Sequence, residues 1–256
     1  MAKRRVKRRD TAEVRRIYLR SRRAEAQFAR KLRQLARRIG ELAHGMYDAD
    51  DPIGSSQRLQ SLLRNYGQTL RPWAREQARR MVVDVMRRDE VFWAERTKQM
   101  GRALKEEIQN APTGVMFRER TQEAASYITS LPLEAAQRIE QLTVKMITNS
   151  ARAGELSQDI LRTGHVTKSR ADLIARTEVA RTASTLTEVR ARHVGSTHYT
   201  WRTVGDIDVR DLHRHLNGNV FAWDDPPVTG SNGERSAPGG IYNCRCYAEP
   251  HIPDEP

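Results

Sequence analysis

Apolar residues recur at helical spacing in the first part of the chain. Between about residues 11 and 45, successive apolar positions lie four and three residues apart: Phe28, Leu32, Leu35, Ile39 and Leu42. This spacing places them along one face of a helix, while arginines occupy the other faces. The pattern covers too few heptads for a long coiled coil, so we expect this face to pack against a neighbouring helix.

Further amphipathic segments follow, separated by turn signals such as Ala111-Pro112-Thr113-Gly114. We expect helices at about 56–66, 70–110, 115–129, 133–151, 155–161 and 168–193. The longest has apolar side chains at near-helical intervals: Trp73, Val82, Met86, Trp93, Met100, Leu104 and Ile108. Pro132 should lie near the first turn of its helix, and Thr167 or Ser169 should cap the last one, which ends before Gly195.

The character of the sequence changes after residue 195. Residues 197–204 are β-branched and aromatic, which predicts a strand. Asn217-Gly218 between apolar flanks indicates a hairpin, residues 224–240 read as a loop, and 241–252 as a last strand. We therefore expect a mainly α protein: an elongated helical N-terminal region, then a small α+β C-terminal module with a short antiparallel sheet. The expected division is 1–23, a basic N-terminal arm; 24–165, the helical region; and 166–256, the module.

Positive charge is concentrated at the N-terminus. The whole chain has a net charge of +13, and residues 1–40 hold 16 Lys or Arg against three acidic residues, so the remainder is neutral. Such a block either contacts nucleic acid or forms a solvated helix face for an acidic protein partner. Because few aromatic residues accompany it, we expect phosphate contacts rather than base readout. The candidate phosphate-binding residues are Lys3, Arg4, Arg5, Lys7, Arg8, Arg9, Arg15 and Arg16.

Three features exclude other classes of protein. No stretch approaches the roughly 20 apolar residues that a membrane-spanning helix needs. The basic N-terminus is not followed by the apolar segment of a secretory signal. Two cysteines do not make a disulfide framework. We therefore expect a protein of a reducing compartment or of an assembled particle.

The residues best suited to metal binding or catalysis lie in the last 60 positions. Cys244 and Cys246 are two apart, so on a strand their thiols would emerge on the same side. With His213 and His251 they form a candidate Cys₂His₂ or Cys₂His zinc site. Alternatively, the cysteines are small buried hydrophobic residues and the histidines serve hydrogen bonds. A nucleophilic pair of Cys244 with His213 is a further alternative, although no third orienting group is evident.

Four motifs occur in order between about residues 165 and 250. They are an Ala-Arg-Thr-Glu helix, a Trp-containing strand, an Asp-x-x-x-Arg-x-x-His-x-x-Leu-x-Gly segment and a terminal Cys-Arg-Cys. This order resembles the phage head-morphogenesis family, the Mu F-like minor head proteins. The matching residues are Arg176, Thr177, Glu178, Trp201, Asp206, Arg210, His213, Leu216, Gly218, Cys244, Arg245 and Cys246.

The resemblance implies a structural protein rather than an enzyme. It implies a minor capsid protein of a tailed bacteriophage, present in few copies near the portal or the inner capsid, that supports procapsid assembly and DNA packaging. The implied partners are the portal protein, the major capsid or scaffold protein and packaged double-stranded DNA, with no membrane. The implied location is the virion, and the host cytoplasm during assembly.

Two other functions stay open at this point. In a metal-dependent nuclease of the His-Asn-His type, His213, Asn217 and His251 would hold a cation. A plain DNA-binding protein would use only the basic arm.

The charged residues around the motifs carry two expectations of local contacts. Arg245 should face away from the thiols, with Glu178 as a possible carboxylate partner. A network around His213 should involve Asp206, Asp208, Arg210 and Asp211.

Overall fold

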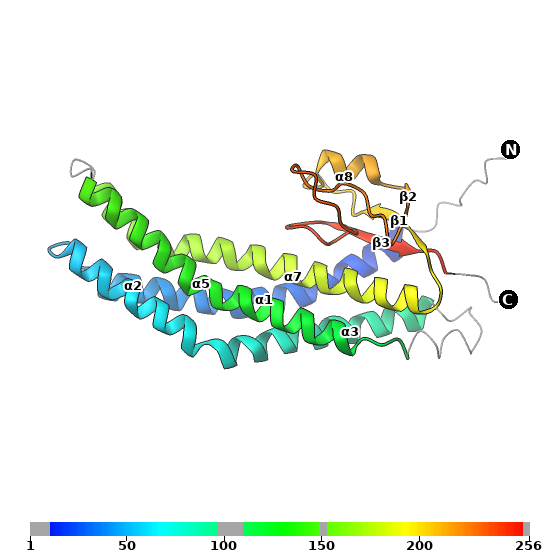
Figure 1. The fold of residues 1–256 in the computed structure, drawn as a ribbon, viewed down its shortest axis with the longest axis horizontal. Coiled ribbons are helices and arrows are strands. Elements are labelled where there is room, and N and C mark those ends of the chain that lie inside the picture. The colour runs from blue at the N-terminus through cyan, green and yellow to red at the C-terminus, as the bar shows by residue number, and fades with distance from the viewer. Residues whose placement is uncertain (1–10, 97–109, 149–152, 253–256) are drawn as a thin grey trace.

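The computed structural model describes residues 11–96, 110–148 and 153–252, and of residues 11–21 only the helical backbone. Long helices form an elongated, gently curved bundle, and a small module with a sheet lies against one end of it (Figure 1). The helices are α1 (Thr11–Met46), α2 (Pro52–Thr69), α3 (Arg71–Arg96), α5 (Gly114–Thr148), α6 (Ala153–Leu161), α7 (Thr163–His193) and α8 (Asp211–Leu216). The strands are β1 (His198–Thr203), β2 (Val220–Ala222) and β3 (Cys246–Pro250). This confirms the expected fold class.

The predicted apolar face of α1 lies in the core of the bundle. Phe28, Leu32, Leu35 and Ile39 are at most 4% exposed, and α1 packs along α7. The two backbones approach closely where two glycines meet: a Cβ atom on Gly164 would lie 2.7 Å from the Cα atom of Gly40. The absence of both side chains therefore sets the spacing of the two helices.

Helix α5 contradicts the expectation of two helices at 115–129 and 133–151. It runs unbroken from Gly114 to Thr148 with Pro132 in its interior. An interior proline removes one hydrogen bond and costs about 3 kcal/mol. Here Pro132 is buried and faces Gly67 of α2, where an added Cβ would lie 3.3 Å from the proline Cγ. The absence of a side chain at Gly67 leaves room for the proline ring where α2 packs against α5.

Several helix ends differ from the predicted ones. Helix α2 starts at Pro52, because the Asp51 carboxylate caps it by accepting a hydrogen bond from the Gly54 backbone N–H at 3.0 Å. Helix α7 starts at Thr163, so Thr167 is interior and its hydroxyl donates to the Thr163 carbonyl instead of capping. Ser169 is interior as well. The predicted glycine end of α7 is confirmed: Gly195 has φ +84°.

The expected helix over 70–110 is described only in part. It corresponds to α3, which ends at Arg96, and Met100, Leu104 and Ile108 lie outside the described residues. Within α3, Val82 and Trp93 are buried as the pattern predicts. In the described ranges, no helix is both long enough and apolar enough to span a bilayer.

The sheet has the order β2-β1-β3, with both pairs antiparallel. Tyr199 and Trp201 of β1 are fully buried and anchor a second core. The predicted hairpin at Asn217-Gly218 is wrong: Leu216 ends α8, and this turn leads from α8 into β2. It is fixed by the Asn217 side chain, which accepts a hydrogen bond from the Thr203 backbone N–H at 3.0 Å.

The last strand is shorter than predicted. It begins only at Cys246, because turns occupy the segment before it, where Gly239 has φ +90° and Asn243 has φ +56°. Helix α7 joins the two cores: its residues up to Val179 lie in the core of the bundle, whereas Ala191 near its end lies in the core of the module.

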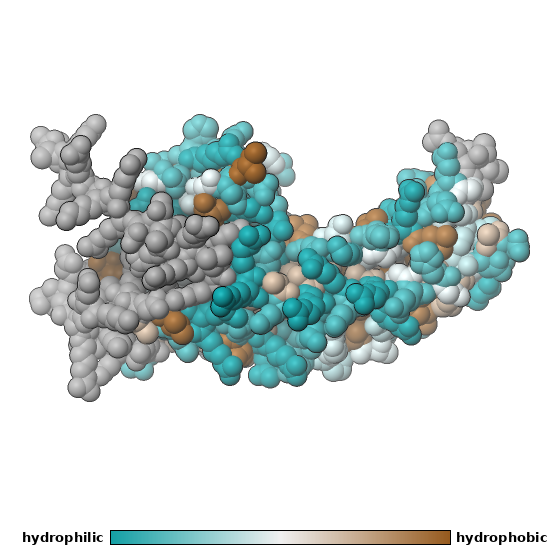
Figure 2. All heavy atoms as spheres, turned by 180° about the vertical axis from the view of Figure 1, so that it is seen from behind, coloured by the Kyte–Doolittle hydropathy of each residue, from teal (hydrophilic) through white to brown (hydrophobic). Residues whose placement is uncertain are grey.

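The part of the molecule that is coloured in Figure 2 is largely hydrophilic on the face shown, with isolated hydrophobic residues. The outline is hollowed between the module and the far end of the bundle (Figure 2).

Candidate functional site

The module brings together three of the predicted metal ligands. The Nδ1 atom of His213 lies 3.6 Å from the sulfur of Cys244 and 3.4 Å from that of Cys246. All three ligand atoms lie within 4.8 Å of one another, and the three residues are 1%, 4% and 8% exposed. We call these residues the His-Cys cluster.

Three different elements supply the cluster. His213 lies in the middle of α8, Cys244 lies in the segment before β3, and Cys246 is the first residue of β3. The imidazole ring contacts the ring of Trp201 edge-on, with centroids 5.3 Å apart. Because the carbonyl of Thr229 only accepts, the His213 Nε2 atom, at 3.1 Å, donates a hydrogen bond to it. The other nitrogen, Nδ1, therefore faces the two sulfur atoms.

Hydrogen bonds make the two thiols unequal. The thiol of Cys246, the imidazole of His213 and the Gly239 backbone N–H, which lies 3.3 Å from the sulfur, lower the pKa of Cys244 to about 4 against the effect of burial. The shared hydrogen bond with Cys244, and then burial, raise the pKa of Cys246. Burial opposes a positive charge on His213, but its contacts with Cys244 and Thr229 raise the pKa of its ring on balance. The cluster thus favours one thiolate beside an imidazole.

His251, the fourth predicted ligand, is not part of the cluster. It is exposed, and its Nε2 atom lies 2.8 Å from the Thr200 hydroxyl. The physical reason is the geometry of β3, since His251 follows Cys246 by five residues. At about 3.3 Å per residue it lies roughly 16 Å from Cys246, and because five is an odd number its side chain points to the opposite face of the sheet. The nuclease arrangement of His213, Asn217 and His251 is likewise not brought together, since each has a separate partner.

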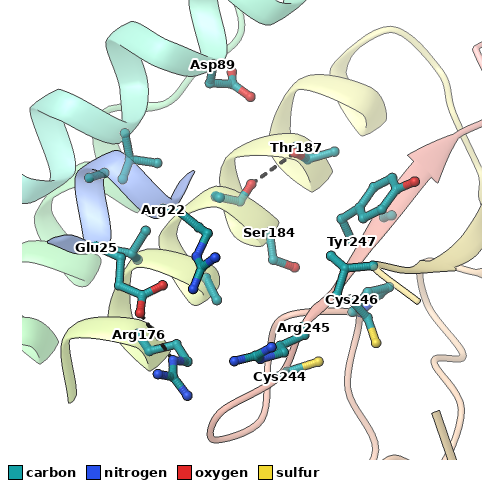
Figure 3. Close-up of a pocket in the computed structure, with 18 of the residues that line it drawn as sticks. Arg22, Glu25, Asp89, Arg176, Ser184, Thr187, Cys244, Arg245, Cys246 and Tyr247 are labelled. Carbon is teal, nitrogen blue, oxygen red and sulfur yellow. Dashed lines mark hydrogen bonds and ion pairs between the residues drawn. The ribbon is translucent and has the colours of Figure 1, made fainter. Parts of the chain in front are cut away.

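Arg245 faces away from the thiols, as expected, but its partner is not Glu178. In Figure 3 its side chain extends toward Arg176, whereas the sulfur atoms of the two cysteines point elsewhere. It forms ion pairs with Asp206 and with Asp208, the latter at 2.9 Å. Both carboxylates belong to the segment that follows β1, which lies beside residue 245 because the Val204 backbone N–H donates to its carbonyl.

The expected network of Asp206, Asp208, Arg210 and Asp211 around His213 is also wrong, because Asp206 and Asp208 pair with Arg245. Arg210 donates to the carbonyl of Tyr242 at 2.8 Å, and Asp211 pairs with Arg214 on the exposed side of α8. These side chains lie outside the buried face of α8, which carries His213.

The Arg-Thr-Glu motif of α7 holds the segment that precedes the cysteines. Arg176 donates to the Asn243 side-chain oxygen at 2.6 Å, and the Thr177 hydroxyl accepts from the Asn243 backbone N–H at 3.2 Å. Arg181 donates to the carbonyl of Gly240 at 2.8 Å. The backbone of the turn is so close that a Cβ on Gly239 would lie 3.1 Å from the carbonyl oxygen of Ala180 on α7. The segment before the cysteines is thus fixed against the part of α7 that carries the Arg-Thr-Glu motif, although the two are far apart in sequence.

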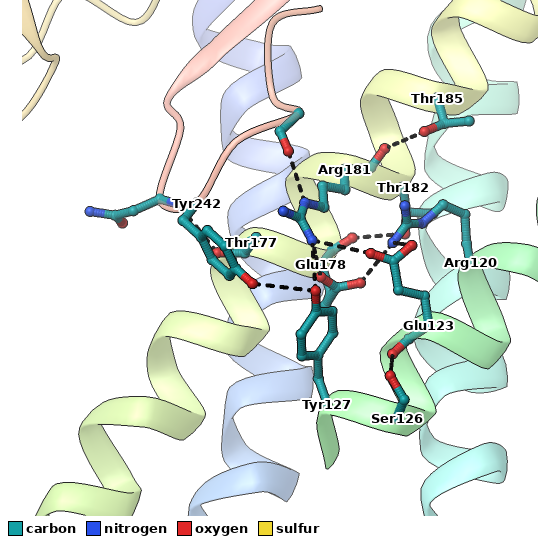
Figure 4. Close-up of polar contacts among 12 residues, drawn as sticks. Arg120, Glu123, Ser126, Tyr127, Thr177, Glu178, Arg181, Thr182, Thr185 and Tyr242 are labelled. Atoms are coloured by element: carbon teal, nitrogen blue, oxygen red, sulfur yellow. Dashed lines mark hydrogen bonds and ion pairs between the residues drawn. The ribbon is translucent and has the colours of Figure 1, made fainter. Parts of the chain in front are cut away.

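Glu178 lies at the centre of a buried charge network between α5 and α7 (Figure 4). Its side chain is 1% exposed, and its carboxylate pairs with Arg120 at 2.9 Å and with Arg181 at 3.3 Å. Burial raises the pKa of Glu178, against the attraction of the two arginines. Arg181 also pairs with Glu123, and it lies over the ring of Tyr242, 4.7 Å from its centroid.

Sequence reasoning missed the α5 members of this network. Arg120, Glu123 and Tyr127 approach α7 from more than 50 residues away in sequence. No local pattern distinguishes these side chains from the other polar residues of an amphipathic helix.

A cavity of about 130 Å³ lies between the bundle and the module (Figure 3). Helices α1, α3 and α7 line one side of it, and residues 244–248 line the other. At its edge Asp89 pairs with the buried Arg190 at 2.9 Å. Burial raises the pKa of Asp89 to about 7, against the attraction of Arg190.

The predicted DNA contacts fall on a part of the chain whose side chains are not described. Lys3, Arg4, Arg5, Lys7, Arg8 and Arg9 lie outside the described residues, and Arg15 and Arg16 lie where only the backbone of α1 is described.

Fold and site together define a helical bundle with a small, docked His-Cys module. The family described as "Phage Mu protein F like protein" matches residues 137–249, from the second half of α5 to β3. The C-terminal part of the chain therefore matches the family that its motifs resemble.

A protein of Haemophilus influenzae, described as "Uncharacterized protein", is 27% identical over 123 residues, which are 48% of this chain. The chain covers only 26% of that relative's length. No solved structure matches the chain.

Proposed function

We propose that this protein is a head-morphogenesis protein of a tailed bacteriophage, a minor capsid component that acts near the portal or the inner capsid during procapsid assembly and DNA packaging. The observation that carries the proposal is the family match over residues 137–249. The structure adds support, because the family motifs build one unit: the segment before the cysteines lies on the Arg-Thr-Glu turn of α7.

The proposed role is structural rather than catalytic. The module is fixed to α7 by hydrogen bonds and by ion pairs that extend to α5, which suits a component that must keep its shape inside a larger assembly. The face of the bundle seen in Figure 2 is long and mostly polar, and it is proposed to meet the portal or the capsid or scaffold protein.

The basic arm is proposed to contact packaged double-stranded DNA. The excess charge of the whole chain lies in residues 1–40, and the solvent-facing side of α1 continues the basic character with exposed residues: Arg23, Arg30, Lys31 and Arg37. Phosphate contacts of this kind release counterions, so affinity falls with salt at a slope of about −0.9 per contact on duplex DNA.

Deletion of residues 1–10 tests the DNA contact without touching the described structure. The deletion removes six Lys or Arg residues. We expect weaker binding to duplex DNA and a log–log salt slope that is shallower by up to about 5. The control replaces Arg64 and Arg162, which are exposed at other places of the bundle, by Gln and should change the slope little. An unchanged slope after the deletion would contradict a DNA-binding arm.

Co-purification tests the proposed partner. An affinity-tagged chain expressed with the portal, capsid and scaffold proteins of its own phage should retain the portal protein after a wash at high salt. The Phe28→Asp variant, which disrupts the core between α1 and α7, serves as a misfolded control. Recovery of none of the three head proteins with the folded chain would contradict the proposed role.

A further inference from the structure

We propose that His213, Cys244 and Cys246 bind a Zn²⁺ ion that joins α8 to the start of β3. This inference goes beyond the role in head morphogenesis and does not depend on it, because it rests on the geometry of the His-Cys cluster alone.

The distances in the cluster match a zinc site. Zinc takes a tetrahedral arrangement with Zn–S of about 2.3 Å and Zn–N of about 2.0–2.1 Å, which separates a nitrogen and a sulfur ligand by about 3.6 Å. The His213 Nδ1 atom lies 3.6 Å and 3.4 Å from the two sulfur atoms. Both nitrogen–sulfur distances are therefore close to those of a zinc site, and all three ligand atoms lie within 4.8 Å of one another.

The surroundings of the cluster orient His213 and Cys244 as zinc ligands. A zinc-bound histidine ordinarily donates its second ring N–H to a carbonyl or carboxylate, which fixes the tautomer. In this protein Nε2 donates to the carbonyl of Thr229, leaving Nδ1 for the ion. Thr229 is itself held by its backbone N–H, which donates to the Glu234 carbonyl at 2.7 Å, and by its hydroxyl, which contacts the Ser236 hydroxyl at 2.9 Å. The Gly239 backbone N–H is directed at the Cys244 sulfur, as in N–H···S contacts to a thiolate.

The donor set selects zinc over harder cations. Two thiolates and one imidazole suit zinc, whereas magnesium and calcium prefer oxygen ligands. Within the described ranges the cluster contains three ligand residues, so water completes the tetrahedron. A metal link also suits the module physically, since its buried core consists of only a few side chains and small cores gain from such cross-links.

Metal analysis of the purified full-length chain tests the inference. The protein is expressed with added zinc, desalted without chelator and analysed by inductively coupled plasma mass spectrometry. We expect close to one zinc ion per chain for the wild type and a loss of most of it in Cys244→Ser, Cys246→Ser and His213→Gln. The matched control is His251→Gln, which changes an exposed histidine outside the cluster and should keep its zinc.

Cobalt substitution keeps the test valid if the cysteine variants do not fold. Addition of Co²⁺ to the wild-type chain, stripped of metal, should give thiolate-to-cobalt charge-transfer absorption and the visible bands of tetrahedral coordination. Added Zn²⁺ should abolish this absorption and protect both thiols from a thiol reagent. A wild-type chain without zinc and without a cobalt spectrum would overturn the inference, as would full zinc content in Cys246→Ser. Loss of zinc from His251→Gln would overturn the assigned ligand set.

Discussion

Removal of the Glu178 carboxylate should destabilise the protein far more than removal of an exposed carboxylate in a similar pair. Glu178 is 1% exposed and lies between Arg120 and Arg181, which are 12% and 15% exposed. In Glu178→Ala the two buried guanidinium groups are left, among the residues that the structure describes, with Glu123 as their shared counter-ion. Removing one partner of a buried ion pair costs about 3–5 kcal/mol, because it leaves uncompensated buried charge.

Glu140→Ala is the matched control. Glu140 also lies on a long helix and also pairs with an arginine of another helix, Arg64 of α2, at 2.7 Å. Both side chains are half-exposed, so the pair contributes about 0–1 kcal/mol. The two variants thus differ in the burial of the charges rather than in the type of contact.

The free energy of unfolding is measured by urea denaturation at pH 7, with far-ultraviolet circular dichroism and tryptophan fluorescence as two probes. We expect Glu178→Ala to lose about 3–5 kcal/mol, with an unchanged denaturant slope, and Glu140→Ala to lose less than about 1 kcal/mol. Glu178→Gln, which keeps the shape and one hydrogen-bonding oxygen, should fall between them. Equal losses in Glu178→Ala and Glu140→Ala would refute the reasoning that burial makes the Glu178 carboxylate the more stabilising of the two.

Two further predictions concern the packing and the pH dependence of the bundle. Gly164→Ala should lower the free energy of unfolding by about 1–3 kcal/mol, because its Cβ would lie 2.7 Å from the Cα atom of Gly40. The control Gly154→Ala, whose Cβ would meet no atom within 4 Å, should be neutral or stabilising. Thermal unfolding compares the two variants, and equal effects would contradict the close approach of α1 and α7. Because burial raises the pKa of Asp89 from 3.8 to about 7, the folded chain retains a proton that the unfolded chain releases. The free energy of unfolding should therefore fall as the pH rises from 4 to 7, by roughly 4 kcal/mol at most. Asp89→Asn should make this fall smaller. Parallel pH profiles of the wild type and Asp89→Asn would contradict the raised pKa of Asp89.

The helices could be predicted from the periodic apolar residues, but where one helix ends and the next begins depends on long-range packing. The face of α1 from Phe28 to Ile39 could be predicted because helical spacing alone places those residues together. The continuity of α5 through Pro132 could not, because it depends on Gly67 of another helix. The start of α7 at Thr163 lies where α7 approaches α1 at Gly40, a contact that no local pattern indicates.

The candidate site was predictable in its ligand types but not in its geometry. The spacing of Cys244 and Cys246 indicated that both thiols point the same way, and the structure confirms it. The choice between His213 and His251 required the tertiary fold, since α8 returns over the sheet to place His213 beside them. The partner of Arg245 was unpredictable for the same reason: Glu178 was the carboxylate expected from the sequence, and the path of the segment after β1 brings Asp206 and Asp208 to Arg245 instead.

The central claim, that this chain is a component of a phage head, is tested most directly by quantitative mass spectrometry of purified procapsids and finished virions. With the portal protein as internal reference, the account predicts the chain in both kinds of particle, in far fewer copies than the major capsid protein. Its absence from both, with the protein recovered only in the soluble fraction of the lysate, would contradict the account.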